Sequence, residues 1–156
     1  MISYGLFMRT SDIWSPIIRM TTWSPWSHVA TVITKDLAYE SVFKSGVVRT
    51  PLRNILKRAT KFEFIEYDTD NKKLMQFMEA QVGKPYDYTA VAGIAFHRNW
   101  QEDDSWFCSE LHAAGHRYAG NALIDKECNR VTPYDAYVSV VGTKRGANIV
   151  PAELGL

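Results

Sequence analysis

The feature that most restricts the fold of this chain is a series of short strand-like segments connected by even shorter turns. Residues 2–8 and 62–67 show the alternation of a half-buried strand, and residues 28–34 are rich in β-branched side chains. Two more such segments, 39–43 and 47–50, follow after turns of only a few residues. Parallel strands need a crossover of about a dozen residues or more. These links therefore predict an antiparallel sheet.

Helical patterns occur between these segments and dominate the second half of the chain. Asp70 is a suitable N-cap for one helix and Gly83 a suitable end for it, and Ser11-Asp12 and Ser105 are expected to cap two others. The expected helices cover residues 12–20, 51–58, 72–82, 88–96 and 106–118, with a turn at 132–135 and a last strand at 138–141. We therefore predict one α+β domain spanning residues 1–156, with a small antiparallel sheet packed against helices.

Composition excludes several classes of function. Hydrophobic residues make up 46% of the chain, which is enough for a core, and the net charge of +1 argues against binding to nucleic acid. The longest apolar run, residues 90–96, is too short to span a bilayer, and the first residues do not resemble a signal peptide. Two cysteines without a CxxC spacing favour a reducing compartment. We expect a cytoplasmic protein as made, with signal-independent export left open.

Cys108 lies at the start of a predicted helix and is the best candidate for a catalytic nucleophile. The free N–H groups and the dipole at a helix N-terminus stabilise a thiolate, which is the reactive form of the side chain. With Ser105 as the N-cap, Cys108 falls in the first turn, where the same N–H groups could also stabilise an oxyanion.

His28 is the best candidate for the base that activates this thiol. It opens a predicted strand directly after an aromatic loop, and strand ends often face a cleft. Glu40 lies on the next predicted strand. If the two strands pair, its carboxylate can orient the imidazole of His28.

Four short segments resemble the circularly permuted papain-like amidases, the NlpC-type enzymes of the YiiX and YaeF kind. They are residues 26–29 (WSHV), the strand of Glu40, residues 83–87 (GKPYD) and residues 107–111 (FCSEL). The resemblance extends over roughly residues 1–145 and implies a papain-like fold in which the histidine strand precedes the cysteine helix. It implies Cys108 as nucleophile, His28 as base and Glu40 as the orienting group, with Tyr86 lining the site and helping to bind the oxyanion.

We expect no catalytic role for the other polar residues near Cys108. Cys108, His112 and His116 share one helical stripe, and two histidines at this spacing can bind zinc. A straight helix, however, cannot wrap three ligands spanning two turns around one ion, so we expect no metal and treat the histidines as polar contacts or surface residues. Cys128 is expected to be structural or incidental. Glu110 is expected to be solvated or paired with a basic neighbour.

Aromatic and basic residues near the predicted site complete the set of candidates. Trp23, Trp26 and Trp106 either pack in the core or line a substrate groove, and we expect one or two of them to line it. A basic run is expected to be a solvated helix face, with contact to an anionic surface as the alternative. The run consists of Arg53, Lys57, Arg58 and Lys61.

The sequence thus predicts a cysteine hydrolase that cleaves an amide, ester or thioester bond through an acyl-enzyme on Cys108 and needs no cofactor. The resemblance implies cell-wall (peptidoglycan) peptides or acylated small molecules as substrates, without choosing between them. Peripheral contact with an envelope or lipid is compatible with this prediction. Two alternatives stay open. One is an acyl transferase of the same fold, and the other is a non-catalytic binding or structural module of a phage or envelope.

Overall fold

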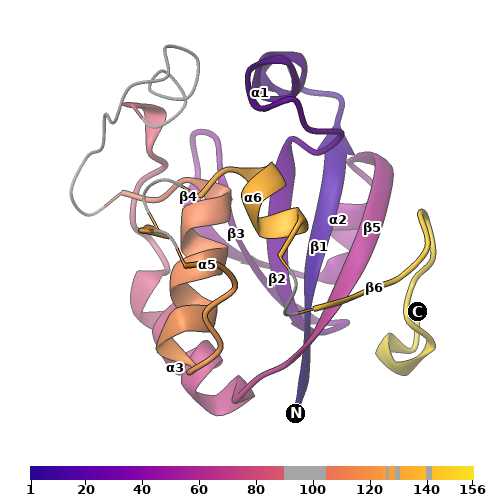
Figure 1. The fold of residues 1–156 in the computed structure, drawn as a ribbon, viewed down its shortest axis with the longest axis vertical. Coiled ribbons are helices and arrows are strands. Elements are labelled where there is room, and N and C mark those ends of the chain that lie inside the picture. Colours follow the sequence, from indigo (N-terminus) through magenta and orange to yellow (C-terminus); the bar gives the residue numbers. More distant parts are fainter. Residues whose placement is uncertain (90–104, 126, 129–130, 140–141) are drawn as a thin grey trace.

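A single antiparallel sheet forms the centre of the molecule. The computed structural model describes residues 1–89, 105–125, 127–128, 131–139 and 142–156. The strand order within the sheet is β4-β3-β2-β1-β5-β6, and each neighbouring pair is antiparallel (Figure 1). The strands are β1 (Ile2–Thr10), β2 (His28–Thr34), β3 (Leu37–Val42), β4 (Gly46–Thr50), β5 (Ala59–Asp68) and β6 (Thr143–Lys144). The antiparallel sheet predicted from the short turns is confirmed.

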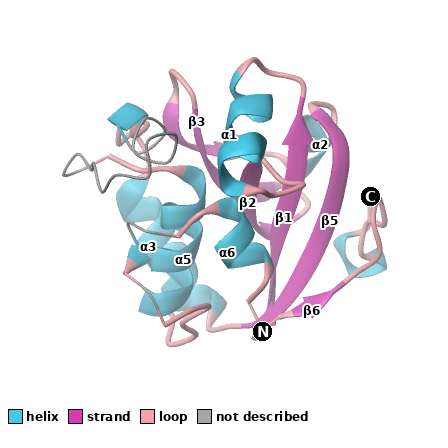
Figure 2. Cartoon of the chain, turned by 45° about the horizontal axis from the view of Figure 1, so that its top comes forward, coloured by secondary structure: helices cyan, strands magenta, loops and turns pink. Residues whose placement is uncertain are grey.

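Helices cover both faces of this sheet. On one face lie α3 (Asn71–Gln81), α5 (Cys108–Tyr118) and α6 (Pro133–Tyr137), and on the other lies the short α2 (Leu52–Leu56) (Figure 2). At one end of the sheet stands α1 (Trp14–Thr22), and a single 3-10 turn, η2 (Ala152–Leu154), lies near the C-terminus. None of the helices within the described residues has the length and apolar character needed to cross a membrane.

The alternation of side chains along β1 divides the core between the two faces. Tyr4, Leu6 and Met8 point toward α2 and pack with Leu52 and Ile55. The intervening positions face α5, where Phe7 packs in a cluster that contains Cys108. The prediction of a strand at residues 2–8 is confirmed, but the strand is buried on both faces along most of its length and not half-buried as predicted, because helices cover both sides of the sheet.

Local capping explains several helix boundaries. The Asp70 side chain accepts hydrogen bonds from the backbone N–H groups of Lys72 and Lys73, which confirms the predicted start of α3. At α1, the Asp12 carboxylate accepts from the N–H groups of Trp14 and Ser15, so the helix begins slightly later than predicted.

One predicted cap and one predicted strand differ from the structure, and one predicted helix lies mostly outside the described residues. Ser105 is not the cap of the cysteine helix, because α5 begins at Cys108 and Phe107 occupies the N-cap position. The strand predicted at 138–141 is wrong for residues 138–139, which follow the end of α6, and the last strand is instead Thr143–Lys144. The helix predicted at 88–96 lies for the most part outside the described residues.

Candidate active site

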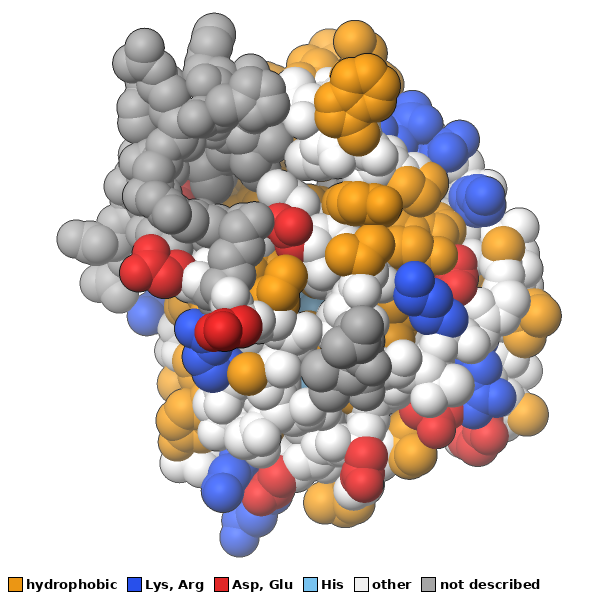
Figure 3. Space-filling view, viewed as in Figure 1, with side chains coloured by type: hydrophobic (Ala, Val, Ile, Leu, Met, Phe, Trp, Pro, Cys, Tyr) orange, Lys and Arg blue, Asp and Glu red, His pale blue; other side chains and the backbone are white. Residues whose placement is uncertain are grey.

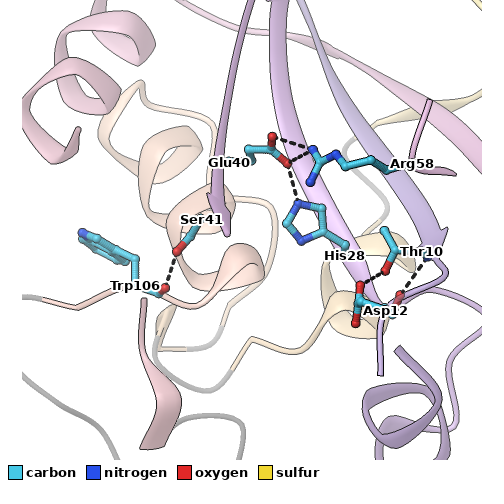
Figure 4. A network of polar contacts seen from close by, with 8 residues as sticks. Thr10, Asp12, His28, Glu40, Ser41, Arg58 and Trp106 are labelled. Atoms are coloured by element: carbon cyan, nitrogen blue, oxygen red, sulfur yellow. Dashed lines mark hydrogen bonds and ion pairs between the residues drawn. The ribbon is translucent and has the colours of Figure 1, made fainter. Parts of the chain in front are cut away.

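A buried carboxylate links a histidine to an arginine at the end of the sheet. The Nε2 atom of His28 lies 2.9 Å from Oε2 of Glu40 (Figure 4). The guanidinium of Arg58 donates to both oxygens of the same carboxylate, at 2.7 Å and 2.8 Å. Glu40 therefore bridges the two cations and holds the imidazole in one orientation.

The strand pairing explains why these residues meet. Thr31 of β2 is opposite Tyr39 of β3, so continuing the antiparallel register places Glu40 two residues diagonally from His28 on the same face. This is the face of β3 that α2 covers, because Ala38, on the same side, packs against Leu52. Arg58 follows α2 directly and so reaches the carboxylate. The sequence predicted Arg58 on a solvated helix face, because nothing in the local pattern indicates that its guanidinium pairs with Glu40, 18 residues away.

The charges of this group favour the ionised state of each member. Burial would raise the pKa of Glu40, but hydrogen bonds and charge interactions with His28 and Arg58 outweigh it and lower the pKa from 4.5 to about 2. Burial would likewise lower the pKa of His28. Interactions with Cys108 and with the Glu40 carboxylate outweigh burial and raise the pKa of His28 from 6.5 to about 10. A protonated His28 is thus stabilised at neutral pH.

Cys108 is the first residue of α5 and lies close enough to His28 for its charge to raise the pKa of the imidazole. Nε2 of His28 is engaged by Glu40, so Nδ1 is the ring nitrogen that Glu40 leaves available. The Cys108 side chain is only 2% exposed. With Phe107 as the N-cap, Cys108 occupies the first helical position, two positions closer to the helix end than capping by Ser105 would give, where free N–H groups stabilise negative charge. The structure thus brings Cys108, His28 and Glu40 together.

Glu110 holds the start of this helix and is not solvated, contrary to the sequence prediction. Its carboxylate accepts a hydrogen bond from the backbone N–H of Phe107 at 3.1 Å, and its side chain is 3% exposed. Burial raises the pKa of Glu110 from 4.5 to about 7; the Phe107 N–H opposes this rise, and the charge of Asp87 adds to it. The residue is therefore a buried cap that fixes the turn carrying Cys108.

The GKPYD segment, residues 83–87, runs beside the residues that lead into α5. Trp106 and Tyr86 form a bridge in which the Trp106 N–H donates to the carbonyl of Pro85 and the Asp87 N–H donates to the carbonyl of Trp106. A Ser41 hydroxyl of β3 also donates to the Trp106 carbonyl, at 2.6 Å. The GKPYD segment and the residue before the FCSEL segment, Trp106, are thus held side by side by hydrogen bonds in both directions.

A glycine is needed where β4 meets this segment. Gly46 has a φ of 69°, and a Cβ at this position would lie 2.1 Å from the backbone oxygen of Lys84. The Val47 N–H donates to that same oxygen at 2.9 Å. The absence of a side chain at Gly46 therefore lets β4 hold the GKPYD segment in place.

Tyr86 lies in this segment close to Cys108. Its ring packs edge-on against Phe107, with the centroids 6.0 Å apart, and the residue is buried. Burial raises the pKa of Tyr86 well above its usual value, and the negative charges of Cys108 and Asp12 raise it further. The phenol therefore keeps its proton and can donate a hydrogen bond.

A cavity of about 470 Å³ opens beside His28. Its mixed lining combines apolar walls with charged groups of both signs, at Asp12, Lys44 and Arg58. The apolar part consists of Ile13, Trp14, Ile18, Val42, Phe43 and Tyr86. Such a combination of a broad apolar wall with a few polar groups is typical of a pocket for a small organic ligand.

The three tryptophans expected near a groove are not among the residues that line this cavity. Trp26 is buried and packs against Tyr137, while Trp106 packs against Phe77. Trp23 lies at the end of α1 with 89% of its surface exposed. Trp14 supplies the tryptophan wall instead, which sequence reasoning missed because Trp14 lies far from His28 along the chain and reaches the cavity only through α1.

His112 and His116 are core residues of α5 and make polar contacts there. Nδ1 of His112 lies 2.8 Å from the Thr31 hydroxyl, and Nδ1 of His116 lies 3.3 Å from the Thr69 hydroxyl. Burial lowers the pKa of His116 to about 3 and that of His112 well below its usual value, so both rings are neutral. Among the described residues, no group of three or more His, Cys, Asp or Glu is placed to hold a metal ion.

Comparison with known proteins gives a family match and a similar solved structure. The model of the permuted papain-like amidase enzymes of the YaeF/YiiX kind, the C92 family, matches residues 6–129. The fold is similar to a crystal structure described as metalloprotein yiiX from Escherichia coli O157:H7. The TM-score is 0.70 at 18% sequence identity, and the similarity covers 92% of this chain and 95% of that chain. No curated protein matches the sequence significantly.

Proposed function

This chain belongs to the permuted papain-like amidase family, and on that premise we propose that it hydrolyses an acyl compound through a thioester on Cys108. The bond cleaved is an amide or, with the same chemistry, an ester or thioester. The observation that carries the proposal is the hydrogen bond between His28 and Glu40, with Cys108 at the start of α5 close enough to raise the pKa of the same imidazole. Family membership supports a cysteine hydrolase at the level of reaction class.

In the proposed reaction the Cys108 thiolate attacks the substrate carbonyl carbon while His28 is protonated. The tetrahedral intermediate carries its negative charge on the former carbonyl oxygen. Backbone N–H groups at the start of α5 and the Tyr86 hydroxyl are the proposed donors to this oxygen, because both lie beside Cys108 and the phenol keeps its proton. His28 then gives its proton to the leaving group, and the C–N or C–O bond breaks to leave the thioester.

The second half of the reaction uses the same histidine as a base. Neutral His28 accepts a proton from water, the hydroxide attacks the thioester carbonyl, and the Cys108 thiolate leaves as the carboxylic acid product is released. Glu40, fixed by Arg58, keeps the imidazole oriented through both steps and stabilises its positive charge. No step of this mechanism calls on a cofactor.

An acyl-trapping experiment tests the nucleophile directly. The intact mass of the protein is measured after exposure to 4-nitrophenyl acetate, and the modified peptide is identified by fragmentation. We expect one acetyl group on Cys108, none on this peptide in Cys108→Ala, and unchanged labelling in Cys128→Ala. Cys128 is the matched control because it is the second of the two cysteines and burial raises the pKa of its thiol. Equal acetylation of wild type and Cys108→Ala would refute the proposal.

An acyl transferase is the second candidate, and the apolar wall of the cavity favours it. Ile13, Trp14 and Phe43 line the space next to His28 and could accommodate a hydrocarbon chain. Such an enzyme would pass the acyl group from Cys108 to an acceptor other than water. Single-turnover release of the acyl group, measured with and without added amine or alcohol acceptors, separates the two. Release that is independent of acceptor supports the hydrolase.

The natural substrate is proposed at the level of chemical class. Cell-wall peptides and acylated small molecules both present an acyl carbon that would fit the reaction above. Competition of free peptides and of short fatty acids with acetylation of Cys108 would rank the two classes.

A further inference from the structure

Helix α1 presents an apolar stripe to solvent instead of to the core. The stripe follows intervals of 3, 1, 3 and 3 residues, which place its members on one helical face and on the two residues that flank the helix: Ile13, Pro16, Ile17, Met20 and Trp23. Ile13, Met20 and Trp23 are 79%, 76% and 89% exposed. A continuous apolar patch of this kind on a soluble protein marks a site of interaction.

The opposite side of the helix is held firmly by the domain. Ile18 belongs to the buried core beside α5 and Trp14 packs on the ring of Phe43. The Ser15 hydroxyl donates to the Ser27 hydroxyl at 2.7 Å in a buried contact. The orientation of α1 is therefore fixed by its own packing, and the apolar stripe is not free to rotate inward.

The conformation of Trp23 is a second, independent sign that the exposed indole is selected. Trp23 has a φ of 52° in the left-handed region, where a bulky side chain is strained and asparagine or glycine is preferred. The chain nevertheless carries tryptophan here, with almost all of its surface in solvent. Stability alone does not explain this choice, whereas an amphipathic ring at the tip of a helix is typical of a membrane interface.

Positive charges lie on one side of the stripe. Arg19 lies on α1 itself, Arg9 donates to the carbonyl of Pro25 in the loop after α1, and Lys61 lies over the ring of Trp26. Lys44 lies across the cavity from α1. Figure 3 shows hydrophobic side chains at the top of the molecule, over α1, with Lys and Arg side chains beside them. The α1 sequence contains no acidic residue.

The nearest acidic residue does not cancel this charge pattern at the tip. Asp12 precedes the helix, and its carboxylate accepts hydrogen bonds from the N–H groups of Trp14 and Ser15 and from the Thr10 hydroxyl. It thus lies at the end of α1 opposite Trp23. The stripe and its cationic border complement a surface that is apolar inside and anionic outside.

We propose that α1 docks this domain on an anionic lipid surface, with Ile13, Ile17, Met20 and Trp23 inserted at the level of the headgroups. A lipid bilayer fits better than a second copy of the chain. A two-fold dimer through α1 would bring the Arg19 side chains of both copies to one interface, and the acidic group beside the stripe, Asp12, is already held by its own chain through Thr10, Trp14 and Ser15. Interfacial helices with an apolar face and Lys or Arg at the border bind anionic bilayers.

Docking in this orientation would place the cavity at the lipid. Ile13, Trp14 and Ile18 of α1 form one wall of the cavity beside His28. The helix that contacts the bilayer is therefore also the helix past which a substrate enters. Binding to lipid itself does not depend on the proposed chemistry, since none of the inserted side chains takes part in the acyl transfer to Cys108.

Vesicle sedimentation tests the proposal with matched variants of the full chain. Vesicles of phosphatidylcholine with about 30% phosphatidylglycerol supply the anionic surface, and pure phosphatidylcholine vesicles are the comparison. We expect the wild type to bind the anionic vesicles and Trp23→Asn to bind about tenfold more weakly, because one large apolar side chain no longer leaves water. Ile149→Ser, which removes an apolar side chain exposed on another part of the surface, should bind as the wild type does.

Two further measurements make the result decisive. Asparagine suits the left-handed conformation, so Trp23→Asn should unfold at the same temperature as wild type or higher, which excludes misfolding as the cause of lost binding. Cys108→Ala should bind vesicles like wild type, so that failure of the acyl chemistry and failure of docking give different results. Equal binding of wild type and Trp23→Asn, or a dimer that Trp23→Asn dissociates in the absence of lipid, would overturn the proposal.

Discussion

The buried cap of the cysteine helix makes the stability of this protein depend on pH in a defined way. Glu110 has a pKa near 4.5 in the unfolded chain and about 7 in the folded chain, because burial disfavours its charge. Its contribution to stability is therefore fully present below pH 4.5 and is lost as the pH rises through 7. At about 1.4 kcal/mol per pKa unit, the difference amounts to roughly 3 kcal/mol of unfolding free energy.

Replacement by glutamine isolates this effect. Glu110→Gln keeps an oxygen that can accept the Phe107 N–H but carries no charge to bury. We expect the stability of the variant relative to wild type to increase by roughly 3 kcal/mol between pH 4.5 and pH 8, with most of the change below pH 7. Urea unfolding at several pH values in this range measures both proteins, and the difference cancels the contribution of other titrating groups.

The control for this experiment is a glutamate that water screens. Glu153 is exposed on the surface, so Glu153→Gln makes the same chemical change without removing a buried carboxylate and is measured over the same pH range. If the difference between Glu110→Gln and wild type stays constant within about 0.5 kcal/mol from pH 4.5 to pH 8, the buried-carboxylate argument is refuted.

Three further changes test the site and its scaffold. Glu40→Gln should lower kcat/KM about a hundredfold and move the alkaline limb of its pH profile to lower pH, because the carboxylate helps raise the pKa of His28; an unchanged profile contradicts this. Tyr86→Phe should lower kcat about tenfold or more with little change in KM if the phenol stabilises the oxyanion, and an unaltered kcat excludes that role. Gly46→Ala should lower Tm by about 4–8 °C, since its Cβ would lie 2.1 Å from a backbone oxygen. Gly120→Ala, also at positive φ but with open space around the Cβ, should lower Tm less.

Sequence periodicity predicted the sheet because alternation reports a local property. The strand at 28–34 begins and ends as predicted, and the strand at 62–67 lies within the longer β5. Turn lengths set the antiparallel pairing, since a chain that reverses within a few residues has no other arrangement. The exact ends of β5 and α2 depended on pairing with β1 and on packing across the sheet, which no local pattern encodes.

The proposed catalytic residues show the same division. Cys108 at a helix start and His28 at a strand start are features of short segments, and their types and positions were visible in the sequence. The partner of Glu40 on its other side was not, because Arg58 reaches the carboxylate only after α2 has folded against the sheet. Glu110 was expected in water for a similar reason: helical spacing places it off the Cys108 face, but the segment around Asp87 covers that side.

The sequence by itself determined which segments become strands, where the cysteine helix begins to within a few residues, and which residue types can supply acyl chemistry. These follow from interactions between residues close along the chain. Only the tertiary structure decided that Trp26 is core while Trp14 lines the cavity, that α1 turns its apolar stripe outward, and that one carboxylate is shared by His28 and Arg58. Those outcomes depend on which distant surfaces exclude water from one another, and that is settled only when the sheet and helices pack.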